Sequence, residues 1–124
     1  MELVIVMVIF SIIAAIGIPT YLQFTQDARR TDAQRLLSDL VSRQEQFRLN
    51  NKTYTGTLGA GGLNGATSTE DGSYLLSVVP ATAACPLVAC YELQAVPQGR
   101  QVEDSCATLT YGSTGQKKPS TCWP

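Results

Sequence analysis

Residues 2–24 read ELVIVMVIFSIIAAIGIPTYLQF, and this stretch decides the fold. Its sixteen residues from Leu3 to Ile18 contain no charge. As a helix, that run is about 24 Å long, slightly short of the bilayer hydrocarbon core of about 30 Å, and Tyr21 and Leu22 extend it at the interface. We therefore expect residues 1–22 to form an apolar helix suited to a membrane or to a filament core.

Two simpler roles for the run are a cleaved secretory signal and a plain membrane anchor. A signal peptide is disfavoured, because no basic segment precedes the run, the run is long for such a peptide, and no small-residue cleavage site follows it. A plain anchor usually carries Lys or Arg at its edge, whereas this run begins after Glu2. Glu2 is either a flank left in water or an acid kept for a partner.

From Thr20 onward the helical pattern becomes amphipathic. Gly17 and Pro19 weaken the helix just before this change, since proline cannot donate to the helix ladder. Beyond them, apolar residues recur at spacings of three, four and seven, and polar residues occupy the other faces. The apolar stripe comprises Ala33, Leu36, Leu37, Leu40, Val41 and Phe47. We predict an amphipathic helix over residues 23–50.

Residues 51–73, NKTYTGTLGAGGLNGATSTEDGS, follow as a predicted connecting loop. The helix should end at about Leu49, since Asn50 and Asn51 favour a turn. Five glycines precede Gly72, and the small, polar composition suits a surface excursion rather than a core. The sequon at 51–53 is short enough to arise by chance.

Three strand candidates occupy the remainder, in residues 74–124. They are SYLLSVVP (73–80), CYELQAVP (90–97) and CATLTYG (106–112), and a fourth short strand is expected near Ser120 to Trp123. The second and third alternate apolar and polar residues, as half-buried strands do. Their inward residues are predicted to be Tyr91, Leu93 and Ala95, and Ala107, Leu109 and Tyr111. The expected fold is α+β, with the long helix packed on a small antiparallel sheet in a domain spanning 23–124.

Composition argues against an enzyme and against a metal site. The chain has no His and no tight CxxC pair, so a mixed Cys/His zinc site is excluded and a Cys-only site is disfavoured. It has no Gly-rich phosphate loop, and the adjacent acids Glu70–Asp71 and Glu103–Asp104 are expected to be solvated. A net charge of −1 offers no general attraction to nucleic acid. We expect neither catalysis nor a cofactor.

The four cysteines all lie in the last third of the chain, at Cys85, Cys90, Cys106 and Cys122. Their spacings fit disulfides, which indicate an oxidising compartment such as the periplasm or the cell surface. Four cysteines allow three pairings, and the spacing alone leaves all three open.

The first 24 residues resemble the N-terminal helix of type IV pilins. In that family a glutamate near the start of the mature chain heads an apolar helix that ends near a Gly-x-Pro break, matched here by Glu2 and by Gly17-Ile18-Pro19. The tail QVEDSCATLTYGSTGQKKPSTCWP (101–124) is similar to the C-terminal loop of the branch that contains minor pilins and DNA-uptake receptors. The family's leader, first three mature residues and methylated amine have no counterpart before Met1, and Ser11 stands near the family's usual helix glycine.

The resemblance implies a structural subunit and no enzyme. Such a subunit is held in the bacterial inner membrane by its helix, processed by a prepilin peptidase, and added by the pilus assembly machinery to an extracellular helical filament of its own copies. The filament would serve adhesion, motility or DNA uptake. Glu2 would compensate the N-terminal amine of a neighbouring subunit, and the helix would stretch at Gly17 and Pro19. The family's tail, together with locality, favours the pairs Cys85–Cys90 and Cys106–Cys122, the second closing a loop worth about 3 kcal/mol.

Two groups of charged residues are candidates for contacts. Arg29, Arg30 and Asp32 follow the apolar run and are either intersubunit contacts or an ordinary solvated helix face. As an alternative function, a minor pilin could capture DNA with Lys117, Lys118 and Arg100, although a two-lysine loop is usually only soluble surface. A type II secretion pseudopilin ranks lower, because the two-disulfide layout and the Cys-Trp tail favour the pilus branch.

Overall fold

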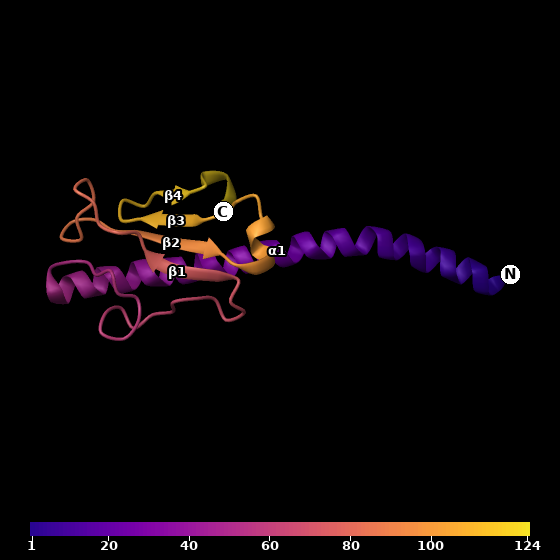
Figure 1. The fold of residues 1–124 in the computed structure, drawn as a ribbon, viewed down its shortest axis with the longest axis horizontal. Coiled ribbons are helices and arrows are strands. Elements are labelled where there is room, and N and C mark those ends of the chain that lie inside the picture. Colours follow the sequence, from indigo (N-terminus) through magenta and orange to yellow (C-terminus); the bar gives the residue numbers. More distant parts are fainter.

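The computed structural model describes residues 1–124, apart from the side chains of Pro19 and Thr20. A single helix, α1 (Glu2–Asn51), forms the N-terminal part of the chain. Its second half lies along a small sheet, while its first half projects alone beyond the globular part (Figure 1). The structure therefore has the predicted α+β architecture.

The end of α1 is set by a left-handed cap rather than by the two asparagines. Lys52 has φ 61°, and its backbone N–H donates to the Arg48 carbonyl at 2.7 Å, which satisfies one of the last free carbonyls of the helix. Asn51 stays helical, and its side-chain amide donates to the Phe47 carbonyl at 3.1 Å. The helix consequently ends at Asn51, slightly beyond the predicted Leu49.

The sheet is a four-stranded antiparallel meander in the order β1-β2-β3-β4. Its strands are β1 (Tyr74–Val78), β2 (Glu92–Pro97), β3 (Leu109–Gly112) and β4 (Lys117–Lys118). Two short 3₁₀ helices, η1 (Gly99–Glu103) and η2 (Ser120–Cys122), follow β2 and β4. Opposite residues such as Leu76 and Ala95, or Leu93 and Tyr111, face the same side of the sheet.

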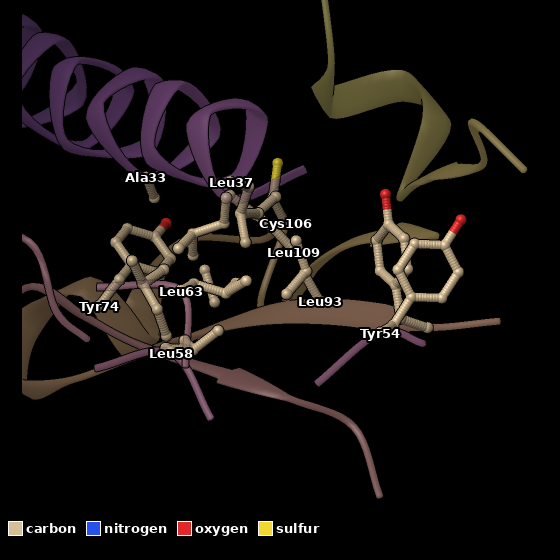
Figure 2. Packing of buried hydrophobic residues seen from close by; sticks show 13 residues of the cluster. Ala33, Leu37, Tyr54, Leu58, Leu63, Tyr74, Leu93, Cys106 and Leu109 are labelled. Carbon is tan, nitrogen blue, oxygen red and sulfur yellow. The ribbon is translucent and has the colours of Figure 1, made fainter. Parts of the chain in front are cut away.

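The core lies between the helix stripe and one face of this sheet. Ala33 and Leu37 of α1 are buried against Leu93 and Leu109 of the central strands (Figure 2). Leu40 of α1 belongs to the same buried cluster. The other predicted stripe residues, Leu36, Val41 and Phe47, are partly buried against the same cluster. The helix period of 3.6 thus meets the strand period of 2 on one shared apolar surface.

Residues 52–73 form the predicted connecting loop between α1 and β1, but part of this loop enters the core instead of staying on the surface. Tyr54, Leu58 and Leu63 are each 5% exposed and belong to the core cluster. The buried amide of Gln44 fixes the start of the loop, donating to the Thr55 carbonyl at 2.7 Å and accepting from the Thr55 N–H at 3.1 Å. A few apolar residues therefore anchor this loop to the core, although its other residues are mostly small or polar.

The C-terminal strands differ from the predicted ones in two respects. β3 begins at Leu109 rather than Cys106, because Ala107 is exposed and adopts a left-handed conformation with φ 52°. The fourth strand is Lys117–Lys118, and the predicted strand near Ser120 to Trp123 is instead the 3₁₀ helix η2. Pro119 before η2 has no N–H to offer to a sheet ladder, which suits the change of structure there.

Two disulfides fasten the sheet at its loops. Cys85 is bonded to Cys90 within the β1–β2 connection, and Cys106 is bonded to Cys122, which ties the residues before β3 to the end of η2. The tail is also held to the helix, since the buried Gln34 amide donates to the Cys122 carbonyl at 2.7 Å.

Candidate assembly and binding surfaces

The projecting half of α1 is apolar and bare. Its large side chains are about half exposed or more, among them Phe10 at 69%, Ile16 at 68% and Phe24 at 69%. Within the described residues, α1 is the one helix that by length and composition could cross a membrane, and none of its apolar window is buried. An apolar surface of this extent needs lipid or other protein chains around it.

The three residues proposed for assembly lie on this bare segment. Glu2 is exposed in the first turn of α1. A side chain added at Gly17 would meet nothing within 4 Å, so this glycine is not required by packing inside the subunit. The side chain of Pro19 lies outside the described residues. The predicted stretching of the helix at this place stays a prediction.

Arg30 is engaged inside the subunit. Its guanidinium donates from Nε and Nη2 to the two carboxylate oxygens of Asp104, at 3.0 and 3.1 Å, and from Nη2 to Asp27 at 2.9 Å. The Asp104 side chain is 2% exposed, so this carboxylate is not solvated as the sequence had suggested. Burial lowers the pKa of Arg30, but the hydrogen bond and charge of Asp104 outweigh it and raise that pKa.

Arg29 and Asp32 keep more of their surface in water. Arg29 lies 3.4 Å from Asp71, and Asp32 lies 3.5 Å from Arg35, with both side chains of the second pair exposed. Hydrogen bonding by Ser73, with smaller contributions from Thr69 and Arg29, lowers the pKa of Asp71. Only Arg29 and Asp32 of the three predicted contact residues remain free to reach a neighbour easily.

Gln101 is an important buried residue that sequence reasoning missed. Its amide nitrogen lies 3.0 Å from the Tyr74 hydroxyl, 3.1 Å from the Gln26 carbonyl and 3.1 Å from Asp104. Asp104 in turn accepts the Cys106 N–H at 3.1 Å. These bonds fix η1 and the start of the disulfide segment against α1, where the bare half of the helix begins. A glutamine in a polar stretch gives no periodic signal of this role.

Two of the three cations proposed for DNA binding, Lys118 and Arg100, line two separate hollows, and Lys117 lines neither of them. Lys118 is exposed and lines a hollow of about 180 Å³ beside the β3–β4 turn and the Cys85–Cys90 disulfide. Arg100 lies in η1 and lines a different groove, next to α1. Neither of these two hollows is lined by both cations.

Lys117 has aromatic neighbours that the sequence did not predict. Its ammonium lies 5.1 Å from the centroid of the Tyr111 ring and 5.3 Å from that of the Trp123 ring, and the two rings meet edge to face at 5.6 Å. The Trp123 indole N–H donates to the Lys118 carbonyl at 3.2 Å. Cation–π attraction therefore holds Lys117 near the tail and leaves Lys118 as the more available charge.

Comparison with known proteins agrees with this architecture. A sequence model of the family described as type IV minor pilin ComP, DNA uptake sequence receptor, matches residues 19–110. Among solved structures, a type IV pilin from Shewanella oneidensis is similar with a TM-score of 0.58 and 30% identity, over 80% of this chain and 98% of that one. No curated protein sequence matches the chain. The chain belongs to the type IV minor pilin ComP family and is a type IV pilus subunit.

Proposed function

We propose that copies of this chain form a helical filament held together by residues 1–22, with residues 23–124 as the outer domain. The observation that carries the proposal is the bare apolar half of α1. Burial of a large apolar side chain is worth about 1.5–3 kcal/mol, so many such residues along one helix give a strong drive to pack against copies. The role is structural rather than enzymatic.

Before assembly, the same surface would be covered by lipid. In this proposal the subunit waits in the bacterial inner membrane, is processed by a prepilin peptidase, and is extracted by the assembly machinery. The filament would reach the cell exterior, where the two disulfides are stable.

In this proposal Glu2 allows assembly only when a neighbouring subunit is correctly aligned. A carboxylate buried among apolar helices is costly unless a cation pairs with it, and pairing with a neighbour's N-terminal amine sets the register of the two helices. Arg29 and Asp32 are proposed to add charge contacts between outer domains.

Filament assembly in cells tests the proposal. Cells that carry the Glu2→Ala chain should keep it in the membrane fraction and yield few filaments of it by electron microscopy and mass spectrometry of sheared material. Glu70→Ala, which removes an exposed acid from the loop, should assemble normally. Equal assembly of wild type and Glu2→Ala would refute the role of Glu2, and filaments that lack the chain altogether would refute its role as the main subunit.

DNA capture is a second candidate function, and the description of the matching family favours it. Lys118, with Lys117 beside it, offers phosphate contacts at the β3–β4 turn, while the chain as a whole carries a net charge of −1. Binding through two lysines alone should be weak and strongly dependent on salt.

Replacement of both lysines tests DNA capture. Lys117→Ala with Lys118→Ala should weaken DNA binding by assembled filaments, and should reduce the slope of log affinity against log salt by about one for each phosphate that the variant no longer neutralises. Arg100→Ala, in the other hollow, tests the third proposed cation separately. Arg35→Ala, which removes an exposed arginine of α1 that lines neither hollow, is the matched control and should change neither quantity. If the double variant binds as the wild type does, the β3–β4 turn is not the DNA site.

A further inference from the structure

A groove lies where α1 leaves the globular domain. It has a volume of about 440 Å³, and one wall is α1 while the other is η1. In Figure 1, η1 is the short orange turn beside the α1 label, at the point where the bare half of the helix begins. The groove is lined by Tyr21, Leu22, Thr25, Gln26, Arg29, Arg100 and Glu103.

The position of this groove along α1 places it at the headgroup layer of a bilayer. A hydrocarbon core of about 30 Å takes about 20 helical residues, which places Tyr21 and Leu22 at its edge when the span begins at Leu3. Tyrosine is enriched at that boundary. Arg29 follows this edge by about two helical turns. Because helical side chains point back toward the N-terminus, its side chain extends toward the membrane.

Two arginines and one acid, Glu103, line the groove. Arg29 and Arg100 come from different elements, and among the described residues Arg100 makes no ion pair within 4.0 Å. Asp71, at 3.4 Å, shares the charge of Arg29 in part, and Glu103, which lies on η1 like Arg100, opposes both arginines. Arginine presents a planar set of donors that fits a phosphate group.

We propose that this groove binds the phosphate headgroup of an anionic phospholipid while the subunit waits in the membrane. The groove continues directly from the span, with apolar residues at its lower end and arginines at its upper end, as a lipid molecule requires. The proposal rests on the membrane-held state described under the proposed function. Binding there would hold η1, and with it the outer domain, close to the bilayer surface until extraction.

Lipid selection by the full chain provides the test. The chain is reconstituted into vesicles of phosphatidylcholine with or without phosphatidylglycerol, and native mass spectrometry then counts the lipids that stay bound. Arg100→Gln should lower the preference for phosphatidylglycerol about fivefold, as expected from about 1 kcal/mol per cation near an anionic surface. Glu103→Gln should raise it by a similar factor.

Arg35→Gln is the matched control, since Arg35 is 76% exposed on α1 and does not line the groove. An equal loss with Arg35→Gln and Arg100→Gln, or equal retention of the two lipids by the wild type, would overturn the proposal. Binding of added inorganic phosphate without lipid preference, or paired copies in place of bound lipid, would also overturn it.

Vesicle flotation separates this proposal from the one on which it rests. If the chain floats with phosphatidylcholine vesicles but shows no preference for phosphatidylglycerol, the membrane-held state is supported and lipid binding in the groove is refuted. A chain that does not float with either vesicle contradicts both.

Discussion

The two halves of helix α1 share one continuous backbone but lie in opposite surroundings. Residues 33–47 bury a single stripe against the sheet and leave charged residues on the outside. Residues 3–18 are apolar on every face, so contact with one sheet would still leave most of their surface uncovered. The first half needs partners all round, and the second half needs one partner on one side.

These opposite surroundings indicate that the two halves have different roles, one in the folding of the subunit and one in its contacts with lipid or with other copies. The packed half stabilises each subunit, while the bare half contributes free energy only when lipid or other copies cover it. Substitutions in the two halves should therefore affect different measurements.

The largest difference is expected between Leu37→Ala and Ile9→Ala. Leu37 is fully buried, so its truncation should lower the free energy of unfolding of the globular part by about 2–5 kcal/mol. Ile9 is 51% exposed, and its truncation should leave that free energy nearly unchanged. Urea unfolding of the full chain in detergent, followed by Trp123 fluorescence, measures both. Equal destabilisation by the two variants would show that the halves are not energetically separate.

A smaller effect is expected at the junction between the halves, where Arg30 pairs with Asp104. Asp104→Ala would leave a guanidinium that is 20% exposed without its main partner, and the unfolding free energy should fall by about 3 kcal/mol. Asp27→Ala removes the other, exposed partner of Arg30 and should cost less than about 1 kcal/mol. The same urea unfolding measures both variants, and similar losses would contradict the central role of Asp104.

Periodicity explains why much of the fold could be predicted from the sequence. The stripe at Ala33, Leu37 and Leu40 and the alternation of Leu93 and Ala95 are local patterns, and each identifies a buried face without knowledge of its partner. The packing partner then follows, because the apolar stripe of the helix and the apolar face of the sheet each need to be covered and can cover each other. The bare half of α1 was equally clear, because an uninterrupted apolar run needs no context.

Contacts between distant residues could not be predicted in this way. Arg30 and Asp104 are 74 residues apart, and no local pattern distinguishes Asp104 from its exposed neighbour Glu103. Leu58 and Leu63 lie among glycines at spacings that match neither a helix nor a strand, so their burial depends on where the loop crosses α1. The aromatic pair around Lys117 likewise forms only when the disulfide brings Trp123 beside Tyr111.

The smallest effects are expected from two tyrosines in the packed region. Both are buried, but the Tyr74 hydroxyl is bonded to Gln101 at 3.0 Å, whereas the Tyr91 hydroxyl has no hydrogen-bond partner among the described residues. Tyr74→Phe should therefore lower the unfolding free energy by about 1 kcal/mol. Tyr91→Phe should leave it unchanged or raise it by up to about 1 kcal/mol, since it removes an unsatisfied polar group.

The same hydroxyls make stability fall at alkaline pH. Burial raises the pKa of Tyr74, and burial together with the charge of Glu45 raises the pKa of Tyr91. Stability is complete below the unfolded pKa of about 10 and is lost as pH rises above it, because the unfolded chain ionises first. Urea midpoints from pH 7 into the alkaline range should fall less steeply for Tyr91→Phe than for the wild type. An unchanged slope would show that ionisation of Tyr91 does not cause the loss of stability at alkaline pH. The core against which α1 packs would then be less closed around this hydroxyl than the structure shows.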